Sequence, residues 1–367
     1  MGCKSAENFR FSKLKKNYCV VIPALVPTGP IRGAIAFANA IADQRRVKIV
    51  ALKQGNGWTP SINKAVEIIC LDGKHFCSFA NWKKYRDILL AFGGRNNVLS
   101  LSMCFSADFL NLFCRKYAQI FSSVRGNLPM NYKFEYGAIG LLLAKFHLLM
   151  LKKFDFVSVM TLSMAEQIKN ISYNNPLIIG NFIDENDIER FRNKLPKNNF
   201  FTFIFVGSLT HRKQPILLIE AIKILSDEGL NVNLNLVGSG DLKNQVLHLT
   251  NKYKLNSKIK LHGHLDYPYN LVSKSDAFIL PSFSEGVSRA LLEALHLGVP
   301  SIVRNVDGSN EVIKPGYNGE YFSNKEELLA VMRNFIGGRY PRSNQSLLPE
   351  NCRQMKEAFK LVSHVEY

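Results

Sequence analysis

The chain has 367 residues, of which 47% are hydrophobic and 21% are charged, so a disordered chain is excluded and two ordinary domains are allowed. A formal net charge of +18 at pH 7 is the outlier and attracts nucleic acid, anionic lipid or phosphorylated substrates. Because the lysines are spread along the chain without a nucleic-acid-binding motif, a membrane surface or phosphate-bearing substrates are favoured over nucleic acid.

The chain start and the cysteines indicate a cytoplasmic location. Residues 1–6 begin like a myristoylation signal, but Ala6 stands where Ser or Thr is required, and the apolar core of a secretory signal is absent. Seven cysteines without a Cys-x-x-Cys pair argue against a disulfide framework or a zinc site. The longest apolar run, 138–151, contains Lys145 and His147 and is too short to span a bilayer. We expect a soluble chain that can associate peripherally with the inner face of the cytoplasmic membrane.

The first half reads as one α/β domain, residues 1–183. A buried-strand pattern at 18–23 is followed by a glycine-containing loop at 26–33 and an alanine-rich helix over about 34–43. This order is typical of the opening unit of a doubly wound sheet. Ser163 is the expected N-cap of a later helix. Further strands are predicted at 47–52, 65–71, 97–102, 119–124 and 156–160.

Strand–helix alternation restarts after a polar segment at 184–199, which we interpret as a linker. A second domain is expected over 200–350 and a carboxyl-terminal amphipathic helix over 351–367. A helix is predicted at 215–226, and strands are predicted at 202–206, 232–237, 258–261, 277–280 and 301–303. The pattern therefore predicts two successive Rossmann-like, doubly wound α/β domains.

Two acidic residues mark the most informative stretch of the second half. Glu285 lies in a loop between a strand and a helix, and Glu293 lies inside that helix. Gly286 allows the backbone to pass close to a ligand, and the helix start can hold an anion. A carboxylate in such a loop accepts hydrogen bonds from sugar hydroxyls. On spacing alone, an ordinary strand–loop–helix unit with two solvated glutamates remains equally open.

Four segments in this order resemble the carboxyl-terminal domain of family 4 glycosyltransferases, which have the GT-B fold of two Rossmann-like domains facing each other across a cleft. They are the lysine motif at 205–213, the glycine loop at 236–240, the E-x7-E pattern within 281–293, and the stretch from 298 to 319. The resemblance covers about residues 200–325. Residues 27–33 resemble, more loosely, the glycine loop that faces the donor phosphates in these enzymes.

The resemblance implies a site for the donor diphosphate. Sugar transfer expels a diphosphate while positive charge builds on the anomeric carbon, so the protein must neutralise the phosphates. By resemblance Lys213 performs this task, with Arg212 as a second cation. Because the helix dipole repels a lysine at a helix start, Lys213 is expected to have an anionic partner. Ser208 stands where the family often has arginine, so Arg212 is expected to supply that contact.

The same resemblance implies that Glu285 binds hydroxyls of the donor sugar. The N–H groups of Gly286 and Val287 would then lie near the phosphate or the sugar. Glu293 would accept hydrogen bonds from the ribose hydroxyls.

Other donor contacts come with an open alternative. Gly29 would let the opposite domain approach the diphosphate, or it is a plain turn glycine. Gly238 and Gly240 would face the donor, or they only form turns. Arg289 would reach phosphate, or it lies on a solvated helix face.

The acceptor side is less legible. Relatives often carry a histidine after the fourth strand, whereas residues 101–108 contain none. Asp108 is a candidate catalytic base, and the alternative is a carboxylate that caps a helix. Arg125 follows a strand and is a candidate for binding acceptor phosphate. No Asp-x-Asp motif is present, which predicts a metal-independent enzyme with Lys213 in place of the cation.

A basic, apolar helix around 141–153 carries Lys145, Lys152 and Lys153, and further basic residues flank Trp82. Such a surface suits anionic lipid headgroups. The alternative is a core helix with snorkelling lysines. If the surface binds lipid, the acceptor is a lipid-linked glycan.

The sequence therefore predicts a retaining, metal-independent glycosyltransferase. It would move a hexose or N-acetylhexosamine from a nucleotide sugar to a lipid-linked oligosaccharide in O-antigen or capsule biosynthesis. Two alternatives stay open: a nucleotide-sugar 2-epimerase of the same fold, and a non-catalytic protein that binds membranes or polyanions. The donor, the acceptor and the linkage are not specified.

Overall fold

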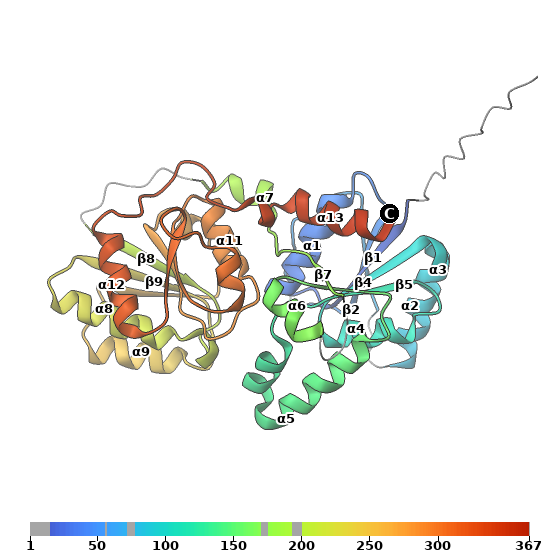
Figure 1. Ribbon diagram of the computed structural model, residues 1–367, viewed down its shortest axis with the longest axis horizontal. Coiled ribbons are helices and arrows are strands. Elements are labelled where there is room, and N and C mark those ends of the chain that lie inside the picture. The colour runs from blue at the N-terminus through green and yellow to red at the C-terminus, as the bar shows by residue number, and fades with distance from the viewer. Residues whose placement is uncertain (1–14, 56, 72–77, 170–174, 193–199, 367) are drawn as a thin grey trace, which may run out of the picture.

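The computed structural model describes residues 15–55, 57–71, 78–169, 175–192 and 200–366, which form two α/β lobes side by side (Figure 1). Residues 1–6 and the end of the expected linker, 193–199, lie outside the described part of the chain. Each lobe contains one parallel sheet with helices on its faces, so the expected α/β fold class is confirmed.

The amino-terminal sheet has seven strands in the order β3-β2-β1-β4-β5-β6-β7. Its central strands are buried on both faces, as a parallel sheet between two helical layers requires. The strands are β1 (Asn17–Ala24), β2 (Val47–Lys53), β3 (Val66–Cys70), β4 (Val98–Ser102), β5 (Gln119–Ser123), β6 (Phe156–Val159) and β7 (Leu177–Ile178). The helices are α1 (Gly29–Ile41), α2 (Phe79–Phe92), α3 (Gly94–Asn97), α4 (Phe105–Phe113), α5 (Leu128–Leu151) and α6 (Leu162–Lys169).

The carboxyl-terminal sheet has six strands in the order β10-β9-β8-β11-β12-β13. The strands are β8 (Phe201–Val206), β9 (Val232–Val237), β10 (Ile259–Gly263), β11 (Ala277–Leu280), β12 (Ser301–Arg304) and β13 (Gly319–Phe322). The α-helices are α7 (Glu185–Glu189), α8 (Pro215–Asp227), α9 (Lys243–Lys252), α10 (Tyr269–Ser273), α11 (Arg289–His296), α12 (Lys325–Ile336) and α13 (Gln354–Glu366). The 3₁₀ turns in the described part of the chain are η1 (His211–Lys213), η2 (Asp307–Glu311) and η3 (Glu350–Cys352).

Two expected helix starts were wrong. Helix α1 begins at Gly29, because a proline at N1 or N2 is preorganised for the first turn. Helix α6 begins at Leu162, and Thr161 Oγ1 accepts from Met164 N at 3.2 Å. Ser163 is therefore a helix residue and not the N-cap.

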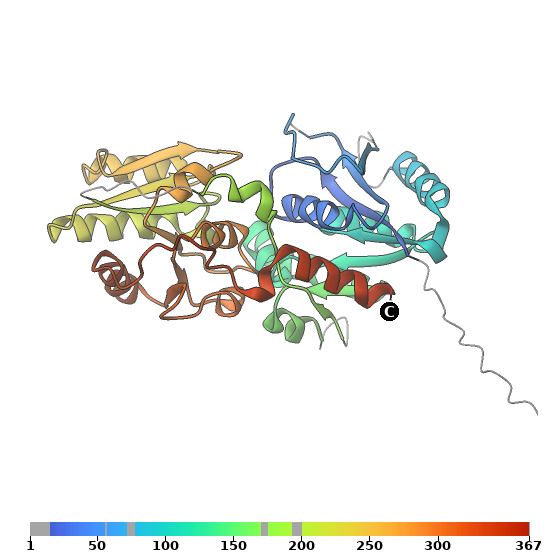
Figure 2. The same cartoon turned by 90° about the horizontal axis from the view of Figure 1, so that it is seen from above.

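The two lobes are joined more than once. One apolar cluster includes Met160 from the first lobe with Val287 and Leu291 from the second. Helix α13 then returns to the first lobe and packs against α1 (Figures 1 and 2). There the Glu366 carboxylate accepts from Tyr18 Oη at 3.0 Å and pairs with Arg45 at 2.7 Å.

Strand order reverses between β1 and β4 in the first sheet, and between β8 and β11 in the second. Parallel sheets bind ligands outside the carboxyl ends of their strands at such reversal points. The loops after β1, β8 and β11 are therefore where a site is expected.

Candidate active site

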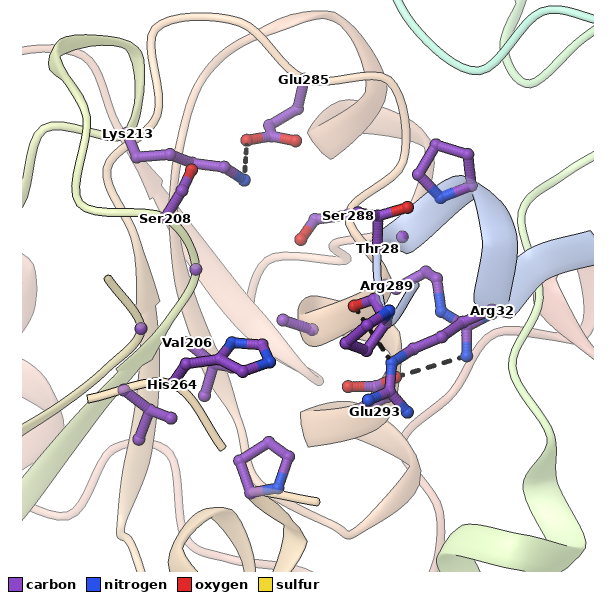
Figure 3. Close-up of a pocket in the computed structure, with 18 of the residues that line it drawn as sticks. Thr28, Arg32, Val206, Ser208, Lys213, His264, Glu285, Ser288, Arg289 and Glu293 are labelled. Carbon is purple, nitrogen blue, oxygen red and sulfur yellow. Dashed lines mark hydrogen bonds and ion pairs between the residues drawn. The ribbon is translucent and has the colours of Figure 1, made fainter. Parts of the chain in front are cut away.

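A pocket of about 650 Å³ lies between the lobes at these loops (Figure 3). The first lobe contributes residues that include Thr28, Gly29, Arg32 and Arg125, and the second contributes the loops that follow β8, β9, β10 and β11. Five cations and three carboxylates line it: Arg32, Arg125, Arg212, Lys213, Arg289, Asp266, Glu285 and Glu293. A pocket with this balance favours an anionic ligand.

Lys213 and Glu285 face each other across the pocket wall (Figure 3). Lys213 ends the 3₁₀ turn after β8, and Gln214 follows in the left-handed conformation with φ of 52°. Lys213 Nζ donates to Glu285 Oε1. Arg212 Nη1 lies 3.2 Å from the same oxygen and donates to Ser284 O at 2.7 Å. The lysine expected to need an anionic partner has one.

The electrostatics keep Glu285 ionised. Burial alone would raise the pKa of this carboxyl, but the charges of Lys213 and Arg212 outweigh burial and lower the pKa below its ordinary value. A carboxylate that is ionised and close to two cations accepts hydrogen bonds from hydroxyl groups.

Glu293 lies on α11 and pairs with Arg289 one helical turn before it. Arg289 Nη2 is 3.4 Å from Glu293 Oε1, and Arg289 Nη1 donates to Phe182 O of the first lobe at 2.8 Å. Burial raises the pKa of Glu293, and the charges of Arg289 and Arg32 offset this only in part. Arg289 therefore does not lie on a solvated helix face.

Two helices from opposite lobes begin at the pocket. Neither Thr28 before α1 nor Ser288 before α11 makes a side-chain cap hydrogen bond. The positive ends of both helix dipoles are thus directed at the same space, which suits a phosphate group.

Gly29 is the first residue of α1 and has room above it. A Cβ there would meet only Arg289 Cδ, at 3.9 Å. Packing therefore does not require glycine at this position, and the backbone here is open to the close approach of a ligand.

Gly286 and Gly238 serve the fold as well as lining the pocket. A Cβ on Gly286 would lie 2.1 Å from Met160 Cε and 3.2 Å from Arg125 O, so glycine lets the lobes meet. A Cβ on Gly238 would lie 1.8 Å from Gly207 O, and Gly238 N donates to Gly263 O at 2.7 Å. The N–H of Gly238 is therefore already used.

Of the remaining predicted donor-site residues, Ser208 and Val287 line the pocket and Gly240 does not. Gly240 lies outside the pocket, and a Cβ on it would meet Leu209 O at 2.5 Å, so it forms a turn. Ser208 and Val287 line the pocket, and Val287 O accepts from Asn181 Nδ2 at 2.7 Å.

Arg125 lies under α1, where Gly33 leaves space for its guanidinium. Its Nη1 lies 3.4 Å from Asn181 Oδ1, and none of the carboxylates described pairs with it within 4.0 Å. Burial, together with the charge of Arg289, lowers the pKa of Arg125 to about 10. A partly buried cation at the pocket wall without a carboxylate partner is suited to bind an anion.

Asp108 is not brought together with these residues. It lies outside the pocket lining and is only 2% exposed. Its carboxylate accepts from Ser102 Oγ at 2.6 Å and lies 2.8 Å from His147 Nε2, while His147 Nδ1 lies 3.1 Å from Tyr132 Oη. In this arrangement the carboxylate is engaged by the fold and does not face the pocket.

Metal ligation finds no support within the described ranges. They contain no group of three His, Cys, Asp or Glu side chains close enough to hold a metal ion. Glu285 and Glu293 each pair with a cation from the chain itself.

Arg32 was missed, although it lies inside the glycine loop that the sequence singled out. Its guanidinium lies 5.0 Å from the Trp58 ring and 5.5 Å from the Tyr267 ring, and it donates to Asp266 O at 2.6 Å. Arg32 therefore connects the lobes at the pocket. Its position one helical turn after Gly29 could have indicated that it lies at the pocket.

Comparison with known proteins agrees with this architecture. Residues 187–357 match the family model described as glycosyl transferases group 1. The UDP-Gal:alpha-D-GlcNAc-diphosphoundecaprenol alpha-1,3-galactosyltransferase of Escherichia coli is 30% identical over 177 residues, which is 46% of this chain and 44% of that protein. The capsular polysaccharide biosynthesis glycosyltransferase CapH of Staphylococcus aureus is 33% identical over 123 residues, 33% of this chain and 35% of that protein. The matches thus span less than half of these relatives.

Solved structures resemble almost the whole chain. Anabaena HepE in complex with UDP and glucose has a TM-score of 0.75 at 15% identity and covers 95% of this chain and 99% of its own. The apo form of the lipopolysaccharide outer core galactosyltransferase WaaB has a TM-score of 0.65 at 14% identity, with coverage of 96% and 100%. These similarities confirm the expected GT-B fold.

Proposed function

We propose that this chain, in which residues 187–357 match the model of the glycosyl transferases group 1 family, transfers a sugar from a nucleotide diphosphate donor with retention of anomeric configuration. The observation that carries the proposal is the meeting of Lys213, Glu285 and Glu293 in one pocket with two helix starts from opposite lobes. A pocket for phosphate alone would not need carboxyl groups in its wall.

The donor diphosphate would lie between Lys213 and Arg212 on one side and the starts of α1 and α11 on the other. Glu285 would accept hydrogen bonds from hydroxyls of the transferred sugar. Glu293, on α11, would accept hydrogen bonds from the ribose hydroxyls. Gly29 leaves the diphosphate room to approach the backbone of the first lobe.

In the transfer step, the bond between the anomeric carbon and the diphosphate oxygen breaks, and its electron pair stays on that oxygen. Lys213 and Arg212 neutralise the charge that develops there. With retention, the acceptor oxygen arrives on the face that the phosphate leaves. Asp108 lies outside the pocket lining, and in this proposal the departing phosphate oxygen takes the acceptor proton.

The acceptor would be a lipid-linked oligosaccharide of surface polysaccharide biosynthesis, an O-antigen or capsule. The name of the Escherichia coli relative states a diphosphoundecaprenol-linked acceptor, and that of CapH states capsular polysaccharide biosynthesis. Arg125 supports the proposal as a cation without a carboxylate partner on the first-lobe wall, suited to acceptor phosphate. Such a substrate would place the protein at the inner face of the cytoplasmic membrane.

The test is incubation with a panel of UDP-, GDP- and dTDP-sugars and polyprenyl-diphosphate-linked saccharides in EDTA, with products identified by mass spectrometry and NMR. We expect one donor to give an α-glycoside. Absence of turnover with every donor would refute the proposal. Conversion of a donor without any acceptor would instead identify a 2-epimerase. A non-catalytic role would be indicated if Lys213→Ala and Glu285→Ala leave cellular function intact.

A further inference from the structure

Helix α5 is a bent hairpin that projects from the first lobe (Figure 1). Gly137 breaks the helix with φ of 62° and ψ of −142°. The second arm folds back against the first, so that a Cβ on Gly140 would lie 2.0 Å from Tyr132 O. Glycine at both positions is thus what allows the hairpin to close.

The hairpin exposes large apolar side chains. Ile139 and Leu142 are 68% and 70% exposed, and six further large side chains of the hairpin are also exposed: Phe134, Tyr136, Leu141, Leu143, Phe146 and Leu149. This finding excludes the alternative that the segment is a core helix with only its lysines at the surface. A contiguous apolar surface of this kind marks an interaction site.

Aromatic rings extend the same surface across α4 and α2. The ring centroids of Phe146 and Phe105 are 6.3 Å apart. Those of Phe105 and Phe109 are 6.1 Å apart, and those of Phe109 and Phe113 are 4.9 Å apart. Phe113 O accepts from Trp82 Nε1 at 3.4 Å. The apolar surface therefore continues from the hairpin across the lobe to a tryptophan.

The charges beside this surface are basic. Exposed Lys133, Lys145, Lys152 and Lys153 lie in or directly after α5, where Glu135 is the single acidic residue between 128 and 153. Lys83 and Lys84 are exposed beside Trp82. Apolar and aromatic side chains bordered by lysines are complementary to an anionic bilayer, with the rings at the headgroup level.

The hairpin has the dimensions to lie in a bilayer surface and not to cross it. Within the described ranges, Leu128–Leu151 is the helix that is long and apolar enough to cross a membrane by length and composition. The apolar run 138–151, taken alone from the sequence, is too short to span a bilayer, so this longer helix was not identified there. The kink leaves a second arm of 14 residues, 138–151, or about 21 Å, against a hydrocarbon core of about 30 Å. The first arm begins at the pocket, which Asn131 lines.

We propose that the α5 hairpin and the adjoining rings of α4 and α2 insert into the headgroup region of an anionic lipid bilayer. The insertion places the mouth of the pocket beside the lipid surface. This proposal gives the membrane location in the proposed function a specific surface, and it holds or fails independently of sugar transfer.

The test is flotation of the full chain with vesicles of phosphatidylethanolamine and phosphatidylglycerol, and with vesicles of phosphatidylcholine. We expect binding to the anionic vesicles that weakens with salt. The double variant Ile139→Ser/Leu142→Ser should bind about tenfold more weakly or worse, since each side chain loses apolar burial. Leu247→Ser, at an exposed leucine on α9 of the other lobe, is the matched control and should bind like the wild type.

A charge pair of variants tests the lipid preference. Lys145→Glu/Lys152→Glu should weaken anionic binding, whereas Lys243→Glu/Lys252→Glu on α9 makes the same change in net charge and should not. In a Trp58→Phe background, Trp82 is the remaining tryptophan. Its emission should be quenched by brominated lipid.

Equal binding by the Ile139/Leu142 variant and the wild type would overturn the proposal. The proposal would also be overturned if the Ile139/Leu142 variant changed its oligomeric state in light scattering but not its binding to vesicles. The hairpin surface would then join two copies of the chain. With a short-chain, water-soluble acceptor, the Ile139/Leu142 variant should keep wild-type turnover. Loss of flotation with that turnover intact separates the membrane surface from the transfer chemistry.

Discussion

Replacing Lys213 by methionine removes the ammonium group and keeps most of the side-chain volume. Lys213 and Glu285 side chains are 11% and 10% exposed, so the variant leaves a buried carboxylate with one partner fewer. Breaking an isolated buried pair costs about 3–5 kcal/mol. Because Arg212 remains 3.2 Å from the same oxygen, we expect a loss of about 2 kcal/mol in the free energy of unfolding.

The catalytic effect of Lys213→Met should exceed the effect on stability. In the proposed function the ammonium group stabilises charge that develops on the leaving diphosphate, and removal of one such group costs about 10²–10³ in kcat. The affinity for the free nucleoside diphosphate should fall as well. Both are measured on folded protein, by turnover at saturating donor and by calorimetric titration.

The pH dependence carries a second signature. Since the pKa of Glu285 is lowered in the folded protein, its contribution to stability is present above its unfolded pKa and is lost as the pH falls through the folded value. Lys213→Met raises that folded pKa. Urea unfolding should therefore show a smaller difference between variant and wild type at pH 3 than at pH 7.

Lys223→Met is the matched control. Lys223 pairs with Asp227 on the exposed face of α8, and loss of such a pair costs below about 0.5 kcal/mol. Turnover of this control should equal that of the wild type. If Lys213→Met keeps both nucleotide affinity and turnover, the assignment of Lys213 to the diphosphate is wrong.

Three further changes test other parts of the site. Gly29→Ala should leave the free energy of unfolding unchanged within about 1 kcal/mol, because the added Cβ meets only Arg289 Cδ at 3.9 Å. Donor affinity should fall about tenfold. Unchanged donor affinity would show that the diphosphate does not approach Gly29. Glu293→Gln should weaken nucleoside binding about tenfold in calorimetry. Because burial raises the pKa of Glu293, any stability gained by this variant should be present in full above the folded pKa. In urea unfolding, this gain should decline as the pH falls through the folded pKa and vanish below the unfolded pKa. Asp108→Asn should cost about 1–3 kcal/mol in stability with turnover of the folded enzyme within about threefold, whereas a thousandfold loss would identify Asp108 as the base.

The alternation of strands and helices was predictable because its signals are local. Apolar runs such as 277–280, bounded by polar and proline residues, gave strands within a residue or two of those observed. Strand β13 was missed because its four residues, Gly319–Phe322, mix glycine and glutamate with aromatic residues. It is a strand because it pairs with β12 along its whole length, which no local pattern reports.

The pocket was predictable where a single segment carries the signal in its own sequence. Lys213 and Glu285 are of this kind. The environment of Asp108 depends on His147, which is 39 residues further along the chain, and the burial of Arg125 depends on Gly33 and Asn181. Such contacts arise from packing between elements and leave no spacing that a sequence can show.

The pocket also depends on how the lobes are held together. The chain crosses between them near Glu185 and again near Arg353, and these crossings are tied by an ion pair of 2.7 Å and by Gln354 N donating to Glu185 Oε1 at 2.9 Å. Rotation about this point would separate Gly29 from Arg289, which now lie on opposite sides of one narrow space. A diphosphate that contacts both lobes therefore binds the closed arrangement more tightly than an open one, and donor binding must favour closure to the same extent.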